Sequence, residues 1–370
     1  MRDELAETLL TKVMNWSDAE KAAQRAFLQD LARYKYDEYQ QYAPGRRFIE
    51  SLALWLRQFQ TEAERRTAYD FVRKRLIFIS IAEMRSLVDL SFATAIRPLL
   101  IASAASRAAL DPLRVKQVAG APQYRTVLRQ TLFLGLSDGA RTDVFRRANP
   151  EISNEQIWHA YDFSDDKAKS MGGKLLKDLR VQLGHEPAKD EACFHTICLL
   201  DDFTGSGTTY IREENGNWEG KIPRIIERLT ASGALNDIVA KSNLEVVVCI
   251  YVASDQAVRH ITEALAAFPF ATGRLQLRVI YPLPPETPLD DAKDAGILAL
   301  ANNDRYFDKS ADDEHTEVAG KSSRLGFAEC RLPVILSHNT PNNSVFLLRG
   351  EYVHTFTGLF PRISRHKRAD

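Results

Sequence analysis

The sequence predicts an α/β protein, in which a parallel β-sheet domain follows an all-helical N-terminal region. Short apolar runs bounded by turn residues recur in the later part of the chain, and runs of this kind are typical of strands buried on both faces of a parallel sheet. Helical stretches separate these runs, as parallel strands require. Earlier residues carry apolar side chains at helical spacing instead. We expect a helical region over 1–118 and an α/β domain over 119–370.

Helix signals dominate residues 3–110. Ser17, Thr61 and Ser80 each precede a glutamate by three residues, which is the pattern of a capping box at the start of a helix. Apolar residues between 48 and 59 fall on one helical face, and the pattern continues from 71 to 90 through two further helices. Arginines are frequent here, but acids are interleaved with them, so solvated helix faces are favoured over DNA binding. The tyrosine-rich piece 34–42 is a candidate surface for a protein partner.

Overall composition argues against several classes of protein. The chain has 370 residues, with 49 Lys and Arg against 49 Asp and Glu, so it has no charge signature for nucleic acid or anionic membranes. No apolar run approaches the roughly 20 residues of a membrane span, and the N-terminus lacks a signal-peptide pattern. Its four cysteines form no C-x-x-C pair. We therefore expect a cytoplasmic protein with reduced thiols, with no contact to membrane or nucleic acid, and open to oligomerisation.

The most informative stretch of the chain is His195–Thr209. A predicted strand, Ile197–Leu200, leads into two adjacent acids, Asp201 and Asp202, and then into a loop of glycine and hydroxyl residues at 204–209. Ligands of open α/β sheets bind at the carboxyl ends of the strands. Glycine-containing turns let backbone N–H groups converge on an anion, and a helix N-terminus favours phosphate. The acids need other partners, and a ribose with Mg²⁺ would supply them.

The sequence Leu-Leu-Asp-Asp-Phe-Thr-Gly-Ser-Gly-Thr-Thr resembles the signature with which type I phosphoribosyltransferases bind phosphoribosyl diphosphate (PRPP). The resemblance covers about the last two thirds of the chain. It implies that Asp201 and Asp202 contact the ribose hydroxyls and hold Mg²⁺ indirectly. It also implies that six residues hold the 5′-phosphate: Thr204, Gly205, Ser206, Gly207, Thr208 and Thr209. Gly205 and Thr208 depart mildly from the family pattern. An ordinary strand-to-helix turn with a capping residue is the alternative interpretation.

A second loop precedes this motif in the chain. Thr131–Leu136 reads as a short buried strand, followed by a tight turn. In the family that the motif resembles, the loop after the first strand holds the pyrophosphate of PRPP. By that resemblance the candidates are Ser137, Asp138, Gly139 and Arg141. A simple strand-to-helix turn is an equal alternative for these residues taken alone.

The α/β alternation continues on both sides of the motif. We expect strands at 156–163, 244–252 and 275–281, and helices at 165–183 and 256–268, the first of them interrupted by Gly172 and Gly173. Those glycines are candidates for a hinge, although a lysine-rich helix is more often a solvated face. The sequence shows no clear lid of the kind that closes over PRPP in the family.

Two features near the C-terminus complete the prediction. A polar segment at 282–324 is too long for an ordinary connection and is expected to be a functional flap or partly disordered. A strand beginning near 332 then runs into a polar cluster, and in the family the loop after the last sheet strand lies near the base. The candidates for reading an acceptor base are His338, Asn339, Asn342 and Asn343. A structural turn rich in Asn and Pro is the alternative.

These observations lead to two functional hypotheses. The first is a phosphoribosyltransferase-like enzyme that binds PRPP or a nucleotide with Mg²⁺ and displaces pyrophosphate at C1 of the ribose. The second is a non-catalytic nucleotide sensor or effector subunit, since its layout also resembles phosphoribosyltransferase-like proteins of bacterial anti-phage defence, some of them encoded beside retrons. The sequence contains no zinc-ligand spacing and no Gly-x-Ser-x-Gly elbow, so nothing in it supports a zinc enzyme or a serine hydrolase.

Overall fold

The computed structural model describes residues 3–160, 164–312, 316 and 322–363. The chain divides into two units, each with its own core: residues 1–83 together with 284–370, which we call the terminal unit, and residues 84–283, the central unit. This division differs from the boundary expected at residue 118. Residues 84–118 belong with the sheet because helix α6 (Arg97–Ala108) packs on helix α8 (Pro122–Arg129), directly before the first sheet strand.

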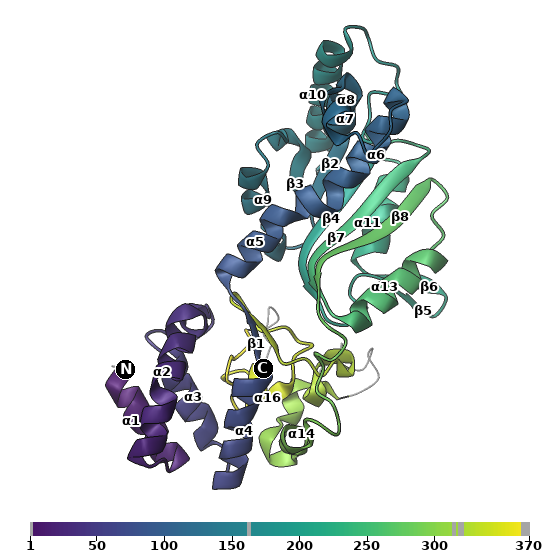
Figure 1. The fold of residues 1–370 in the computed structure, drawn as a ribbon. Helices are drawn as coiled ribbons and strands as arrows, with labels where there is room; N and C mark the ends of the chain where they lie inside the picture. Colours follow the sequence, from purple (N-terminus) through teal and green to yellow (C-terminus); the bar gives the residue numbers. More distant parts are fainter. Residues whose placement is uncertain (1–2, 161–163, 313–315, 317–321, 364–370) are drawn as a thin grey trace. The chain divides into compact units, whose positions relative to one another are not determined.

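The central unit is built on a five-stranded parallel sheet (Figure 1), in the order β3-β2-β4-β7-β8. Its strands are β2 (Thr131–Gly135), β3 (Ile157–His159), β4 (Thr196–Thr204), β7 (Leu244–Ala253) and β8 (Gly273–Pro282). This confirms the predicted α/β fold with a parallel sheet. β3 is shorter than the strand expected at 156–163, whose last three residues lie outside the described part of the chain.

Helices cover both faces of this sheet. Alternate side chains of the central strands, such as Leu199 and Val248, join one core with α10 (Asp165–Leu183), α11 (Lys221–Thr230), α12 (Ala234–Asp237) and α13 (Asp255–Ala267). On the other face Phe133 lies 5.1 Å from Phe145 of α9 (Thr142–Ala148) and 6.2 Å from Phe92, between ring centroids. Helix α10 runs without the expected interruption. A Cβ at Gly172 would stand 2.6 Å from Ile238, so close helix packing explains that glycine.

A long helical stretch, Ile81–Ala108, enters the central unit. It comprises α5 (Ile81–Ser91), a π-helical turn (Phe92–Ile96) and α6, and is followed by the short α7 (Val115–Gly120). By length and composition alone this stretch could cross a membrane, whereas the uninterrupted apolar runs of the sequence predicted no such segment. The core helix of a soluble protein passes the same test, and 44% of its most apolar window is buried inside the structure.

The terminal unit joins the two ends of the chain around an aromatic core. Helices α1 (Asp3–Met14), α2 (Asp18–Tyr34), α3 (Phe48–Arg57) and α4 (Glu62–Lys74) come from the N-terminal part. Strand β1 (Ile77–Ile79) pairs in parallel with β9 (Val334–Leu336) from the other end. The capping boxes at Ser17 and Thr61 are formed as predicted. β1 corrects the prediction of an all-helical region, because Ile77–Ile79 continue an apolar helical pattern in the sequence but form a strand.

The polar segment expected at 282–324 is largely folded in its described residues. Helix α14 (Ala295–Ala301) packs on α4, and Ile297, Leu298 and Tyr306 are buried in the aromatic core. Arg75 pairs with Asp294 at 3.0 Å and donates to the carbonyl oxygens of Glu286 and Pro288. The apolar residues spaced among the charges therefore anchor this segment, so the expectation of disorder was wrong for residues 284–312, and a role as a functional flap stays a prediction.

Candidate functional site

The two acids of the motif lie within β4 and not after it. Because β4 extends to Thr204, Asp201 and Asp202 are successive residues of a strand, whose side chains point to opposite faces of the sheet. Asp201 follows Ile197 and Leu199 toward the helices α10–α13 and is completely buried. Asp202 is half-buried. The resemblance implies the same role for both acids, whereas the structure gives them different surroundings.

Asp201 is enclosed by hydrogen-bond donors. Its Oδ2 accepts from Tyr210 Oη at 2.6 Å and from Lys221 Nζ at 2.5 Å, and its Oδ1 accepts from the Ser137 hydroxyl and from the Asp202 backbone N–H. Burial raises the pKa of the Asp201 carboxyl and the neighbouring charge of Asp202 raises it further, while Lys221 and Ser137 oppose the rise. Burial beside this acid also raises the pKa of Tyr210 well above its ordinary value. Both oxygens of Asp201 are thus engaged by the protein itself.

A β-hairpin brings Lys221 to this acid. Strands β5 (Arg212–Glu214) and β6 (Asn217–Glu219) pair antiparallel, so that the chain returns to its starting point before α11 begins. Gly220 makes the return with φ at 120°, and a Cβ there would lie 2.6 Å from the carbonyl oxygen of Tyr210. Only glycine tolerates this combination of backbone angle and close approach. The hairpin was not predicted from the sequence.

The 204–209 loop is organised by its own side chains. Thr204 Oγ1 accepts from the N–H of Gly207 at 3.1 Å, and Ser206 Oγ lies 2.9 Å from Thr208 Oγ1. The Ser254 hydroxyl, at the start of α13, donates to the Gly205 carbonyl. Among the described residues, none accepts a hydrogen bond from the backbone N–H groups of Gly205, Ser206 or Thr209. These groups are the donors that a phosphate cradle requires.

No helix starts directly after this loop, contrary to the expectation of a helix N-terminus beside the phosphate. The hairpin intervenes, and the first amides of α11 are already used: Lys221 N–H donates to Thr209 O at 3.0 Å and Ile222 N–H to Tyr210 O at 2.9 Å. The loop rests instead on α13, where a Cβ at Gly207 would come within 3.0 Å of both His260 and Ile261. Any anion held here would therefore depend on loop amides and hydroxyls.

The 137–141 loop follows β2 as a tight turn. Ser137 Oγ accepts from the Gly139 N–H at 3.1 Å, and Tyr251, buried in β7, donates to the Ala140 carbonyl at 2.7 Å. Arg141 has a left-handed backbone, with φ at 47°. Its Nε is buried without a hydrogen-bond partner in the described part of the chain. A buried guanidinium nitrogen left in this way calls for an anionic ligand or water.

The two loops meet at Asp202. A Cβ at Gly139 would stand 2.2 Å from Asp202 Oδ2, so the carboxylate occupies the space that glycine leaves open. Since Ser137 also binds Asp201, the carboxyl ends of β2 and β4 form one site with a buried acid, a half-buried acid, a cationic side chain and a loop of unpaired amides. This is the edge where ligands of parallel sheets bind.

Comparison with known families assigns the chain to one of them. The sequence model of the family PRTase-CE matches residues 52–362. The chain belongs to the PRTase-CE family, which is phosphoribosyltransferase-like. The match begins well before the last two thirds of the chain that the motif suggested, and it includes parts of both units. No curated protein and no solved structure matches the chain.

Mg²⁺ is the ion that the resemblance to phosphoribosyltransferases implies for this PRTase-CE site. No group of three or more His, Cys, Asp or Glu side chains that could hold a metal ion occurs among the residues the structure describes. Asp201 does not fit, because four donors surround it. Asp202, half-buried beside Gly139, fits an ion that arrives with the oxygens of a diphosphate.

The acceptor candidates lie in the terminal unit of this PRTase-CE chain. They follow β9, which pairs with β1 and is no strand of the five-stranded sheet, so the expectation that they follow the last strand of that sheet was wrong. Asn343 donates to Phe327 O and Asn339 to Ile363 O, while His338 O accepts from Gln41. These contacts favour the alternative of a structural turn. A role of His338, Asn339, Asn342 and Asn343 toward a base stays a prediction.

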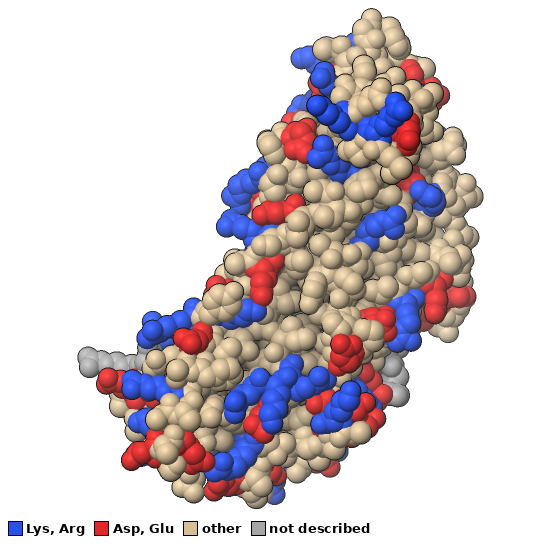
Figure 2. All heavy atoms as spheres, in the orientation of Figure 1, with Lys and Arg blue, Asp and Glu red and all other residues tan. Residues whose placement is uncertain are grey.

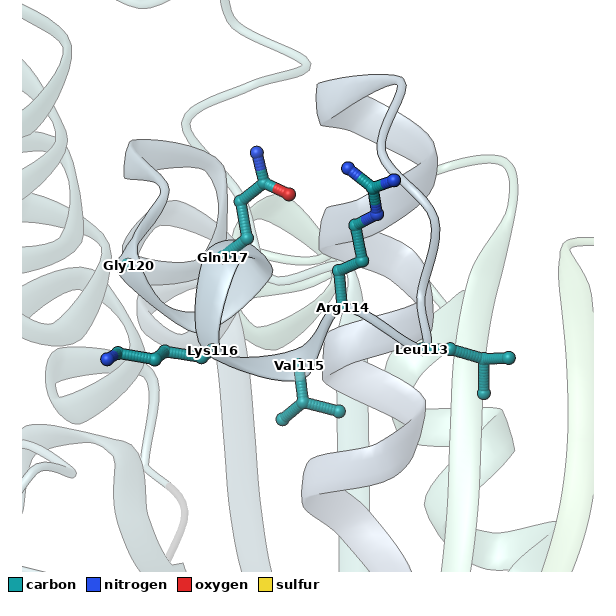
Figure 3. A pocket seen from close by; sticks show the side chains of 6 residues that line it. All are labelled: Leu113, Arg114, Val115, Lys116, Gln117 and Gly120. Carbon is teal, nitrogen blue, oxygen red and sulfur yellow. The ribbon is translucent and has the colours of Figure 1, made fainter.

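A surface hollow also lies elsewhere on the central unit. It is lined by Leu113, Arg114, Val115, Lys116, Gln117 and Gly120 around α7. Figure 3 shows that these side chains fan out from the turn instead of converging. A binding site for a small ligand needs a few convergent polar groups, so this hollow is no rival to the edge of the sheet.

Three residues of the site were not predicted from the sequence. Tyr210 and Lys221 contact Asp201, and Tyr251 holds the 137–141 loop. Tyr210 could have been found, since it directly follows the motif and a tyrosine there has a hydroxyl that needs a partner when buried. Lys221 and Tyr251 carry no local signal, because their roles depend on the hairpin and on the strand order.

Proposed function

We propose that this chain binds PRPP at the carboxyl edge of β2 and β4 and displaces pyrophosphate from C1 of its ribose. A nucleotide of similar shape would occupy the same site. The observation that carries the proposal is the position of Asp202 over Gly139, which unites the motif acid and the 137–141 loop in one site. The family assignment supports the phosphoribosyltransferase-like chemistry.

Each part of the substrate has a partner in this arrangement. The N–H groups of Gly205, Ser206 and Thr209 would hold the 5′-phosphate, and Asp202 would accept hydrogen bonds from a ribose hydroxyl. Arg141, whose Nε is buried without a partner in the described structure, would bind the pyrophosphate. Mg²⁺ bound to the diphosphate would neutralise the charge that develops on the leaving group.

The displacement itself balances simply. The bond between C1 and the pyrophosphate oxygen breaks, and its electron pair leaves on the pyrophosphate. An acceptor nitrogen, or a water oxygen, forms the new bond to C1 and gives up its proton to the departing pyrophosphate or to solvent. The protein contributes by orienting the ribose and by stabilising the charge of the departing group.

One observation favours a second candidate, in which the site binds a nucleotide without transfer. Asp201 is enclosed by the protein's own donors, so a single acid of the motif faces the ligand. A sensor or effector subunit in a bacterial anti-phage system would need binding alone, with a protein partner completing the activity.

The tyrosine-rich segment 34–42 offers little surface for such a partner. Tyr36 and Tyr39 are buried in the core, whereas Tyr34 is exposed.

Surface charge is consistent with a small ligand. On the face shown in Figure 2, basic and acidic side chains are interspersed. The counts of Lys plus Arg and of Asp plus Glu are equal over the whole sequence. We therefore propose no direct contact with nucleic acid.

Calorimetric titration of PRPP with Mg²⁺, with pyrophosphate release followed in the same samples, tests the proposal. We expect Asp202→Asn to weaken PRPP binding at least about tenfold, because it removes a charged hydrogen-bond acceptor. Asp70→Asn, an exposed acid paired with Lys74 in the terminal unit, is the matched control and should bind like wild type. Binding with release supports transfer or hydrolysis, and binding without release supports the sensor. Absence of binding to the wild type would overturn both.

A further inference from the structure

Asp201 and Asp202 place two carboxylates on adjacent residues, and one of them is completely buried. A buried carboxylate is expensive unless a cation and further hydrogen-bond donors satisfy it. In a site that handles diphosphates, a divalent ion is the expected source of that positive charge. Here the source is Lys221, whose Nζ lies 2.5 Å from Asp201 Oδ2.

We propose that the ammonium group of Lys221 is a built-in cation at Asp201, which takes the place of a divalent metal ion there. On this assignment Asp201 is a positioning residue, and Asp202 is the acid that meets ligand and any ion carried by it. The role of Lys221 at Asp201 deepens the proposed PRPP site. Its significance for ligand binding rests on the proposed function, but the ion pair itself does not.

The coordination of Asp201 supports the assignment. Mg²⁺ binds oxygen ligands in near-octahedral geometry at about 2.0–2.1 Å. Both oxygens of Asp201 already face donors, namely Tyr210 and Lys221 at Oδ2 and Ser137 and a backbone N–H at Oδ1. A metal ion at this acid would have to displace the ammonium group. The two would also repel each other.

Lys221 is held in place by more than its ion pair. Its Nζ lies 4.9 Å from the ring centroid of Tyr210, a cation–π contact, and its backbone N–H donates to Thr209 O. Gly220 fixes the chain directly before it. The lysine is therefore preorganised beside the acid, and the hairpin between β5 and β6 is the element that delivers it.

The contacts of Asp201 explain what such a fixed ion pair achieves. Ser137 begins the 137–141 loop, Tyr210 directly follows the 204–209 loop and Lys221 begins α11, and all three bind this one carboxylate. Asp201 thus connects the segments that surround the ligand. A permanently bound ammonium keeps this connection whether or not a metal ion is present.

The test measures the melting temperature, Tm, of the full chain without PRPP as Mn²⁺ or Mg²⁺ is added. We expect no metal-dependent rise in the wild type. Lys221→Met leaves the two acids without their cation, and we expect Mn²⁺ to raise its Tm by roughly 2–4 °C at concentrations several-fold above Kd. The Asp201→Asn/Lys221→Met double variant should lose that rise. Lys174→Met, which breaks a surface pair with Glu155, is the matched control and should behave like the wild type.

Two results would overturn the inference. One is a metal-dependent rise in the wild type that Asp201→Asn abolishes, which can be measured even if Lys221→Met does not fold. The other is a folded Lys221→Met that gains no response to Mn²⁺. Because neither measurement uses PRPP, failure of PRPP to bind in the titration above leaves this test intact and concerns the proposed function alone.

Discussion

Gly139 shows how one residue can govern the site without contributing a side chain. Its Cα is covered by the Asp202 carboxylate, and a methyl group there would occupy the space of Oδ2 and Cγ, at 2.2 and 2.3 Å. The neighbour that must move is the end of a side chain, so the cost to folding is small. The cost to the site is large, since the displaced group is the acid that we assign to the ligand.

We therefore expect Gly139→Ala to weaken PRPP binding about as much as Asp202→Asn, while its Tm stays close to that of the wild type. Titration calorimetry and thermal unfolding of the same preparation measure both quantities. Gly173→Ala is the matched control, because nothing lies within 4 Å of the added methyl group in α10. It should leave binding unchanged and add about 0.5–1 kcal/mol of stability, as alanine does inside a helix. If Gly139→Ala binds PRPP as tightly as the wild type, Asp202 does not take part in binding the ligand.

Asp308 carries a separate prediction about pH in the terminal unit. Its carboxylate accepts from the backbone N–H of Thr355 at 2.8 Å and of Ser310 at 2.9 Å. These hydrogen bonds, that of Thr355 foremost, hold the pKa of Asp308 well below its ordinary value of about 3.9. A depressed pKa means that the ionised acid stabilises the fold above the unfolded-state pKa, and this contribution is lost as the pH falls toward the lower folded-state value.

Accordingly, Asp308→Ala should lower the free energy of unfolding by about 1 kcal/mol at pH 7, the usual effect of removing such a cap. The difference in the free energy of unfolding between the wild type and Asp308→Ala should shrink below about pH 4. Urea unfolding at a series of pH values measures both effects. An undiminished difference at acid pH would show that the carboxylate charge is not what stabilises this turn.

Among the elements, the strands of the five-stranded sheet and β9 were expected from the sequence, whereas β1, β5 and β6 were not. The apolar runs that became β4 and β7 carry their signal in consecutive residues, and helix α10 has the predicted bounds 165–183. β1, β5 and β6 have three residues each. Such strands exist because of a partner, and for β1 that partner is β9 at the far end of the chain.

The same distinction holds for the candidate site. The motif at 201–209 and the 137–141 loop were predictable because each is a local pattern of acids, glycines and hydroxyl residues. The different surroundings of Asp201 and Asp202 were not, because they follow from the strand continuing through both residues. Lys221 was missed because only the closed hairpin places it at Asp201.

The hairpin itself can be tested as an element. Gly220→Ala forces a methyl group to within 2.6 Å of a backbone oxygen at φ of 120°, so we expect a loss of stability of at least about 1–3 kcal/mol. Gly216→Ala, in the hairpin turn, has φ of 78° but nothing within 4 Å of the methyl group, so it should cost only about 1–2 kcal/mol. Chemical denaturation compares them. Equal losses would mean that contact with Tyr210 plays no part in closing the hairpin.

At the scale of the molecule, each unit has a core of its own. Leu52 is completely buried in the terminal unit, whereas all residues of the proposed PRPP site belong to the central unit. We expect Leu52→Ala to lower the free energy of unfolding by about 2–5 kcal/mol, the usual cost of such a cavity. The Kd for PRPP, measured at a temperature where the variant is folded, should stay within about twofold of wild type. A tenfold change in Kd would reveal coupling between the units.

The pairing of β1 with β9 sets an order for synthesis of the protein on the ribosome. Residues 84–283 emerge as one uninterrupted stretch and can fold while translation continues. Residues 77–79 must wait for residues 334–336 before their ladder can form. At roughly 5–20 residues per second this delay is on the order of tens of seconds. During that time α1–α4 expose the apolar side chains that pack against residues 289–360 in their common core, so the early helices are where chaperones have the longest opportunity to bind.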